Sequence, residues 1–307
     1  MGFLFEPGFF SNSPVHVALV IGAVSAVVSA VVGVFTVVRG QSFAGHALTD
    51  VATTGGSASF FYGISPLLGF LGAGVLGAGA MELVGVQRLR GRDIATGIVL
   101  GVATGLAALY LYLDAAKSAT TGAAQQILFG SIFTVAPSTI PLVAVMSIVT
   151  IAVIAFIYRP LLLSSLSSEL AAARGITSRS VGLLFILALA ISVGLSSIAI
   201  GSILSTALLI GPAATSLRVT KTLRSAFVWA IVLGVACTWL GVLFAYDSYY
   251  WFPSSQGLPV SFFIALLIFL SYLASGIRPI RRLVESRRVP RERAAQVLVG
   301  QENGVVN

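Results

Sequence analysis

The stretch that decides the fold is VHVALVIGAVSAVVSAVVGVFTVV, residues 15–38, which contains no Lys, Arg, Asp or Glu. A membrane-spanning helix needs about 20 predominantly apolar residues, so this stretch predicts a spanning helix. It is longer than the apolar core of a signal peptide, and no basic segment precedes it. We therefore expect this helix to remain in the mature protein.

The composition of the whole 307-residue chain extends this prediction. Residues of the AVILMFWYC set make up 57% of the chain, charged residues only 9%, and the mean hydropathy is +1.00. Soluble proteins carry about 25% charged residues, so a soluble enzyme and a nucleic-acid-binding module are excluded despite a net charge of +8. The single cysteine, Cys237, excludes an intramolecular disulfide. We expect an all-α polytopic membrane protein.

Eight further apolar windows follow the first one. They are residues 43–62, 65–86, 94–113, 138–158, 180–197, 199–216, 225–246 and 259–276. Nine spanning helices with the N-terminus outside and the C-terminus in the cytoplasm place every Lys and Arg except Lys117 on the inner side, as the positive-inside rule requires. Eight spans fit only if one segment is re-entrant. Residues 1–276 then form the transmembrane domain, and residues 277–307 form a basic, flexible cytoplasmic tail.

Two stripes of small residues are spaced for close packing of helices in lipid. They are Gly69, Ala73 and Gly77 in one predicted span, and Gly97, Gly101 and Gly105 in the next. We expect packing within the bundle to explain them, and a seam between two copies of the chain is the alternative.

Ionisable side chains inside predicted spans indicate function, because charge is costly in a bilayer. His46 and Asp50 lie four residues apart and therefore share one face of a helix. They belong to the polar stretch GHALTDVATTGG, residues 45–56, which we expect to be buried in protein or to line a cavity. Counted from the basic residue Arg39, Asp50 lies near the bilayer midplane. Glu82, in contrast, lies close to Arg88 at a span end and is expected to form an ion pair there.

An imidazole and a carboxylate on one helix face can bind a divalent cation. Two copies of the chain would supply two His and two Asp ligands, a set that suits Zn²⁺ and accepts Mn²⁺ or Fe²⁺. The alternative is a His46–Asp50 pair that simply satisfies itself within the bundle.

Two further segments have unusual patterns. In STALLIGPAATSLRVTK, residues 205–221, Gly211-Pro212 removes a backbone hydrogen bond and is expected to break or kink the helix. Broken helices often line transport pathways, although an ordinary proline kink is the alternative. In RPLLLSSLSSELAAARGITSR, residues 159–179, a short helix is predicted to end at Arg174-Gly175. It forms either a docking surface for a soluble partner or a plain surface helix.

Together these segments resemble the permease family of ABC importers for zinc, manganese and iron. The resemblance covers residues 15–276 and rests on VVRGQS (37–42), GHALTD (45–50), FGSI (129–132), ELAAARGI (169–176) and LLIGPAATS (208–216). In that family Asp precedes His, whereas here His46 precedes Asp50, and Thr54-Gly55 replaces a Pro-Gly pair. The exchange keeps both ligand types on the same helix face.

The resemblance implies a homodimeric permease in a bacterial inner membrane, without a permanently bound cofactor. It implies a cytoplasmic ATPase and an extracellular metal-binding protein as partners. The residues that it assigns are His46 and Asp50 to the metal, Gly211, Pro212 and Thr215 to the pathway, and Glu169, Ala171, Arg174 and Gly175 to ATPase coupling.

We therefore expect an importer of a divalent metal, with zinc favoured over manganese and iron. The chain contains no GxxxxGK[ST] motif, so ATP hydrolysis is expected on a separate chain. A permease for iron chelates or cobalamin and a secondary transporter without an ATPase are the rival functions, and a membrane enzyme is the weakest one.

Overall fold

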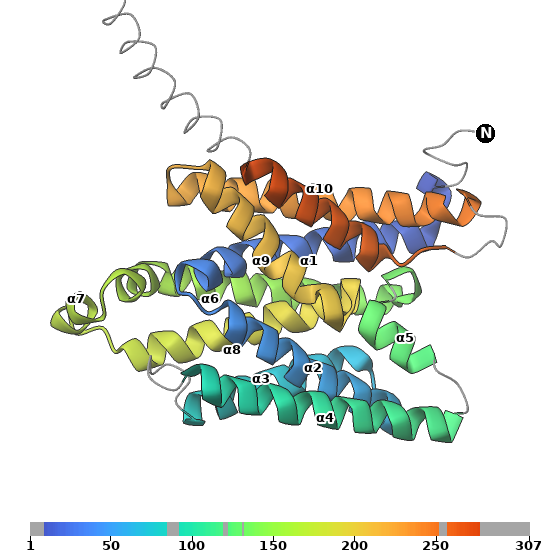
Figure 1. Cartoon of the computed structure of the whole chain (residues 1–307), viewed down its shortest axis with the longest axis horizontal. Helices are drawn as coiled ribbons and strands as arrows, with labels where there is room; N and C mark the ends of the chain where they lie inside the picture. The colour runs from blue at the N-terminus through green and yellow to red at the C-terminus, as the bar shows by residue number, and fades with distance from the viewer. Residues whose placement is uncertain (1–8, 85–91, 119–121, 131, 252–256, 277–307) are drawn as a thin grey trace, which may run out of the picture.

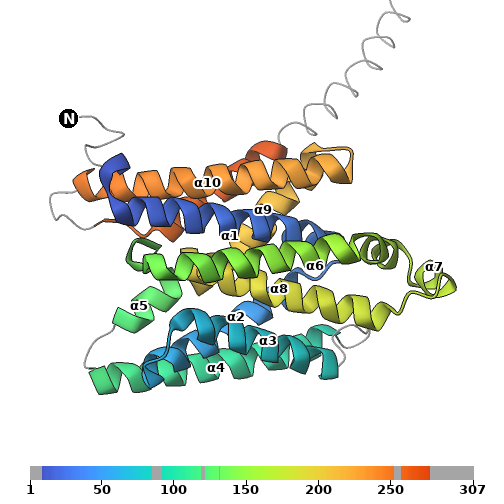
Figure 2. The same cartoon turned by 180° about the vertical axis from the view of Figure 1, so that it is seen from behind.

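The structure is a computed structural model that describes residues 9–84, 92–118, 122–130, 132–251 and 257–276. Most of its long helices run side by side along the longest axis of the molecule, and α9 and the last helix cross this axis obliquely (Figures 1 and 2). The long helices are α1 (Ser13–Val38), α2 (Ser42–Tyr62), α3 (Pro66–Val84), α4 (Arg92–Ser118), α6 (Ile140–Leu166), α8 (Ser178–Ile200), α9 (Ser202–Val219), α10 (Leu223–Trp251) and a last helix, Val260–Gly276. Each coincides with one predicted window. The predicted tail 277–307 lies outside the described residues.

Short elements connect the long helices at both ends of the bundle. They are η1 (Phe9–Ser11), α5 (Gly122–Phe129), η2 (Ile132–Thr134), η3 (Pro137–Thr139) and α7 (Ser168–Ala173). Figure 1 shows α5 at the end where the described chain begins, and α7 projecting from the opposite end.

Not all of these helices are equally apolar. Within the described ranges, six helical segments are long and apolar enough to cross a membrane; they correspond to α1, α4, α6, α8, α9 and α10. Two shorter apolar helices, Pro66–Glu82 and Val260–Gly276, add to them. The molecule is therefore an all-helical membrane protein, and α2 is its polar long helix.

The helices form layers that both cartoon views show in the same order. The α1 and α10 pair lies on one side, α6 and α8 lie in the middle, and α2, α3 and α4 lie on the other side (Figures 1 and 2). The main core joins the middle layer to α1 and α2, with Phe35, Leu48, Phe185 and Leu189 completely buried. The second helix is thereby held between layers, where it can keep polar groups away from lipid.

Glycines in the left-handed region set the helix ends. Gly40 (φ +62°) follows α1 and Gly63 (φ +71°) ends α2. The boundary between the predicted windows 180–197 and 199–216 falls at Gly201, whose φ of 80° and ψ of 162° suit glycine alone. Gly130 (φ +78°) crosses Gly201 so closely that a Cβ on either residue would overlap the other's backbone.

The two stripes of small residues have different surroundings. Gly69 and Gly77 of α3 lie against Gly55 and Val51 of α2, which confirms packing within the bundle for this stripe. A Cβ added to Gly97, Gly101 or Gly105 of α4 would meet nothing within 4 Å among the described atoms. The prediction of internal packing is wrong for this second stripe, because α4 lies at the edge of the bundle and turns its glycines outward.

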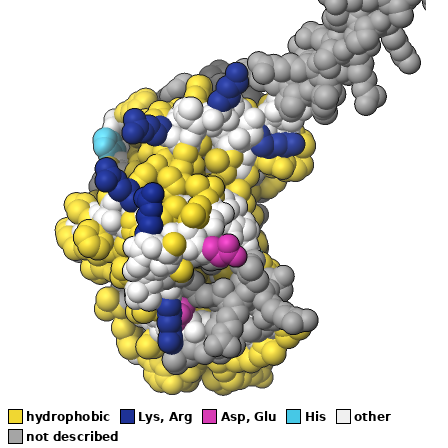
Figure 3. Space-filling view, turned by 90° about the vertical axis from the view of Figure 1, so that its left-hand side faces the viewer, with side chains coloured by type: hydrophobic (Ala, Val, Ile, Leu, Met, Phe, Trp, Pro, Cys, Tyr) yellow, Lys and Arg dark blue, Asp and Glu magenta, His cyan; other side chains and the backbone are white. Residues whose placement is uncertain are grey.

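Basic side chains gather at the end of the molecule that carries α7 (Figure 3). Arg39 caps α1 there, Arg218 lies in the last turn of α9, and Arg174 follows α7. Lys117 lies in the last turn of α4, and α5 at the bundle's other end follows it. The charge asymmetry expected from the sequence is thus present along the bundle axis.

Candidate functional site

The second helix supplies the scaffold of the candidate site. The hydroxyl groups of Thr49, Thr53 and Ser57 are buried and donate to the carbonyl oxygens four residues earlier, at 3.0, 2.8 and 2.7 Å. Side-chain hydrogen bonds of this type satisfy hydroxyl groups without water. The expectation that this polar stretch is buried in protein is confirmed for these residues.

Asp50 is half-buried on the side of α2 that faces α4. The Thr104 hydroxyl, near the middle of α4, donates to Asp50 Oδ2 at 2.8 Å and also lies 2.9 Å from the carbonyl oxygen of Leu100. One turn further on, the Thr54 hydroxyl lies 2.8 Å from the carbonyl oxygen of Ala103. These contacts fix the register of α2 against α4 at the Asp50 carboxylate.

His46 lies one turn before Asp50 and is exposed on the surface of the chain. Among the described residues, the hydrogen-bond partner of the Asp50 carboxylate is Thr104 and not His46. The alternative of a His–Asp pair that satisfies itself is therefore not what the structure shows. His46 and Asp50 instead present one imidazole and one carboxylate near an open face.

One chain offers too few ligands for a complete metal site. In the part of the chain that the structure describes, no group of three or more His, Cys, Asp and Glu side chains could hold a metal ion. Protein sites for zinc and related ions use three or four side-chain ligands. A metal ion bound by His46 and Asp50 would therefore need further ligands besides the His, Cys, Asp and Glu side chains that one chain's described part brings together.

The ninth helix does not break where the sequence predicted. It continues through Gly211 and Pro212 as one helix from Ser202 to Val219, so of the expected break or kink at this pair, the break is wrong. The Thr215 hydroxyl donates to the carbonyl oxygen of Gly211 at 2.8 Å, and neighbouring helices and Ser/Thr side chains make such prolines tolerable in membrane helices. The break lies instead at Gly201, before α9 begins.

The same helix touches the candidate metal site. Its residue Leu209 packs on Gly45, where an added Cβ would lie 3.1 Å from Leu209 Cδ2. Gly45 directly precedes His46. A displacement of α9 near Pro212 would therefore reach the start of α2 through this contact.

The short helix α7 ends where the sequence predicted, at Arg174-Gly175, and its start is capped by a serine. The Ser167 hydroxyl accepts from the backbone N–H of Leu170 at 3.2 Å. At the other end, Gly175 (φ +71°) and Ile176 donate to the carbonyl oxygens of Ala172 and Ala171 at 2.9 and 3.0 Å, which is a Schellman ending. Ala171 is buried, whereas Glu169, Arg174 and Gly175 are exposed. The helix thus presents a small exposed surface, which includes Glu169 and the apolar Leu170, at the basic end of the bundle.

Two acidic residues that lie outside the predicted windows are buried. The windows 94–113 and 225–246 end directly before Asp114 and Asp247, but α4 continues to Ser118 and α10 to Trp251. Asp114 is 8% exposed and Asp247 is completely buried. The available signal was the lack of a helix-ending Gly or Pro directly after either predicted span.

Glu82 forms an ion pair at its span end. Its Oε1 lies 3.4 Å from Nε of Arg179, the second residue of α8. The expected partner, Arg88, lies outside the described residues. The interaction therefore joins α3 to α8 at the end where the other basic residues gather.

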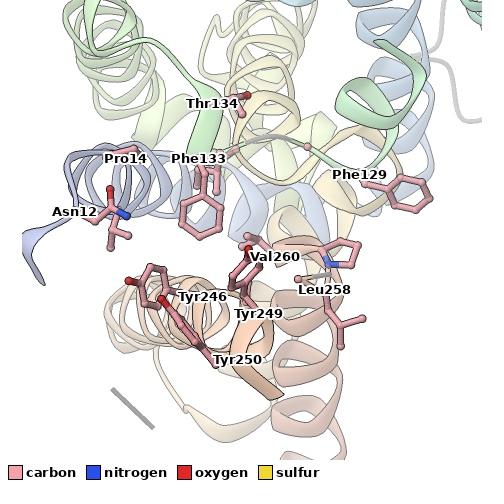
Figure 4. A pocket seen from close by; sticks show the side chains of 17 residues that line it. Asn12, Pro14, Phe129, Phe133, Thr134, Tyr246, Tyr249, Tyr250, Leu258 and Val260 are labelled. Atoms are coloured by element: carbon pink, nitrogen blue, oxygen red, sulfur yellow. The ribbon is translucent and has the colours of Figure 1, made fainter. Parts of the chain in front are cut away.

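A cavity of about 480 Å³ lies at the other end, between the start of α1, η2 and the end of α10. Tyr246, Tyr249 and Tyr250 of α10 lie across it from Phe133 (Figure 4). None of the predicted site residues lines this cavity. It is therefore separate from the His46 and Asp50 face.

Comparisons with known proteins match this chain to one family and to several relatives. The family described as "ABC 3 transport family" matches residues 12–275. The manganese transport system membrane protein MntC of Listeria monocytogenes is 28% identical over 273 residues, covering 88% of this chain and 94% of MntC. The manganese import system permease protein ScaB of Streptococcus gordonii is 28% identical over 269 residues, covering 87% and 94%.

Solved structures support the same fold. The structure of PsaBC from Streptococcus pneumoniae in complex with Fab superposes with a TM-score of 0.74 at 24% identity, covering 87% of this chain and 92% of that one. An inward-facing putative metal-chelate type ABC transporter superposes with a TM-score of 0.71 at 15% identity, covering 88% of both chains. At these identities the likeness concerns the arrangement of helices.

Proposed function

Because this chain belongs to the ABC 3 transport family and is the multi-pass permease subunit of a bacterial ABC importer, we propose that it moves manganese into the cytoplasm. The observation that carries the proposal is the match to MntC and ScaB, both named for manganese, over nearly the full length of each. The preference for zinc inferred from the sequence has no specific support. Imidazole and carboxylate ligands without a thiolate also suit manganese.

The transported ion binds between two copies of the permease in this proposal. Each copy contributes the imidazole of His46 and the carboxylate of Asp50, which together give four ligands. The exposure of His46, together with the single hydroxyl on Asp50 Oδ2, supports this arrangement. The outward-facing glycines of α4, the helix that contacts Asp50, offer a surface on which a second chain can pack closely.

The remaining assignments concern the surface that docks on the ATPase and the residues of the transport pathway. The exposed α7, with Glu169, Arg174, Gly175 and the buried Ala171 beneath it, docks on a separate cytoplasmic ATPase. Gly211, Pro212 and Thr215 belong to the moving part of the pathway, which reaches His46 through the contact of Leu209 with Gly45. An extracellular metal-binding protein delivers the ion at the end opposite to α7.

Orientation and domain limits complete the proposal. In this proposal the chain crosses the membrane nine times, with the N-terminus outside and the basic end of the bundle (Figure 3) in the cytoplasm. Residues 1–276 form the membrane domain and residues 277–307 a cytoplasmic tail.

Manganese uptake by cells that produce single variants tests this function. His46→Ala and Asp50→Ala should each lower uptake at least about tenfold, because loss of one ligand weakens a metal site by that order or more. His16→Ala is the matched control, since His16 is also exposed but contacts the carbonyl oxygen of Phe10 at the opposite end of the bundle. Normal uptake by both site variants, at equal permease abundance, would exclude the assigned site. Uptake of zinc in preference to manganese would contradict the assigned metal.

A further inference from the structure

Arg39 connects three elements at the basic end of the bundle. It caps the C-terminus of α1, and its Nη1 donates to the hydroxyl oxygens of Ser164 and Ser165 at 3.0 and 3.2 Å. Its guanidinium carbon lies 5.4 Å from the centre of the Phe185 ring in α8. A residue that merely marks the cytoplasmic side would not need contacts to α6 and α8.

The two serines are arranged to receive this side chain. Their hydroxyl groups donate to the carbonyl oxygen of Leu161 at 3.0 and 2.5 Å, so their oxygen lone pairs point toward Arg39. Leu161 is itself completely buried. The planar guanidinium offers several donors in a fixed fork and stacks on aromatic rings, which fits both the serine pair and Phe185.

The contacts of Arg39 lie between α7, the helix proposed to dock on the ATPase, and the candidate metal site. Ser165 is two residues before Ser167, whose hydroxyl caps the N-terminus of α7. On the other side, Gly40 and Gln41 alone separate Arg39 from the start of α2. Gln41 is buried and its N–H donates to the carbonyl oxygen of Thr36 at 2.9 Å, so the turn from α1 to α2 is a compact unit. Movement of α7 thus has a short connected route to His46.

We propose that Arg39 is a positioning residue that couples movement of α7 to the helix that holds His46 and Asp50. The inference rests on the proposed function, because it takes α7 as the surface that the ATPase moves. When α7 shifts, the end of α6 shifts with it. The bonds from Ser164 and Ser165 then pull on Arg39 and on the turn that begins α2. Energetic coupling travels through such contiguous packed and hydrogen-bonded groups.

The test uses the complete complex of permease, ATPase and binding protein in proteoliposomes. The quantity measured is manganese ions transported per ATP hydrolysed. Arg39→Gln and the double variant Ser164→Ala/Ser165→Ala should each lower this ratio at least about fivefold, the lower range of coupling between sites, while ATP hydrolysis continues. Combining all three changes should lower the ratio no further than Arg39→Gln alone. Arg218→Gln is the control, because it removes an equal charge from the same end of the bundle, where Arg218 stacks on Tyr272 at 4.5 Å.

The outcomes separate the two proposals. Transport by the wild-type complex with an unchanged ratio in Arg39→Gln and in the serine variant would overturn the role of Arg39 alone. A wild-type complex that hydrolyses ATP without moving manganese would overturn the proposed function and this inference with it. If Arg39→Gln does not accumulate in the membrane, the serine variant decides, because it keeps Arg39 and removes only its hydroxyl acceptors.

Discussion

Among the residues that the structure describes, the Asp50 carboxylate receives one hydrogen bond, from the neutral hydroxyl of Thr104. The Thr104 donor lies on Oδ2, so the carboxylate is oriented without an opposing charge that would compete with a cation. Groups that orient a metal ligand often matter nearly as much as the ligand, because they fix its direction. Thr104 therefore belongs to the candidate site although it cannot be a strong ligand itself.

Thr104→Val tests this orienting role at the scale of one residue. The substitution keeps the shape of the side chain and removes the hydroxyl, so Asp50 loses its fixed direction. We expect the KM for manganese uptake to rise about tenfold, the lower range for loss of an orienting group. Thr104→Ser keeps the hydroxyl and should retain uptake near the wild-type level. An unchanged KM in Thr104→Val would show that Asp50 is positioned without Thr104.

The two proposed ligands, His46 and Asp50, could be inferred from sequence, whereas Thr104 could not. His46 and Asp50 are conspicuous because so few ionisable residues fall inside apolar windows. Thr104 is 54 positions from Asp50, and a threonine in a membrane helix is common enough to give no signal. Only the packing of α4 on α2 brings the two side chains together.

Close packing of α3 on α2 is the feature that places the polar helix. A side chain at Gly69 would overlap the backbone of Gly55 and the Ser59 hydroxyl, whereas Gly72 in the same helix faces open space. Gly69→Val should therefore destabilise the protein by about 1–3 kcal/mol through overpacking, and Gly72→Val should change stability little. The apparent Tm of the detergent-purified permease measures the difference. Equal values for both variants would contradict this packing.

The crossing of Gly130 and Gly201 is a second place where close packing between elements requires glycine. Gly201→Ala places a Cβ against the backbone of Gly130 and Leu128 and also requires a positive φ. Gly40→Ala requires a positive φ in open space, which costs about 1–2 kcal/mol. We expect Gly201→Ala to lower the apparent Tm clearly more than Gly40→Ala does. A smaller effect at Gly201 would mean that the two loops can separate without loss of stability.

Helix positions followed from hydropathy, but contacts between helices did not. The window at 199–216 located α9, yet Pro212 lies inside an unbroken helix. Local rules describe the proline's missing N–H, but they do not tell whether the surrounding bundle keeps the helix continuous. The outward direction of Gly97, Gly101 and Gly105 was equally hidden, since sequence spacing does not tell which side of a helix meets the bundle.

The whole molecule has a charge gradient along its axis. The end with α7 carries Arg39, Arg174 and Arg218, whereas Lys117 ends α4 near α5. In a bilayer this gradient favours the α7 end in the cytoplasm. That orientation also lets α7 meet a cytoplasmic ATPase, so the charge distribution and the proposed function require the same topology.

Single cysteines test this topology across the whole chain. Cys237 is the chain's only cysteine and can first be replaced in Cys237→Ser. In that background, Lys117→Cys should react with a membrane-impermeant maleimide in intact spheroplasts, and Glu169→Cys should react only after permeabilisation, because α6 separates the two positions by one span. Ala103→Cys, which replaces a side chain only 5% exposed, should remain unlabelled in both conditions. The reverse pattern would show that the membrane orientation is opposite to the proposed one. Labelling of Lys117→Cys and Glu169→Cys from one side would exclude the nine-span arrangement. Either result would also remove α7 as the docking surface or change the side from which the ion enters.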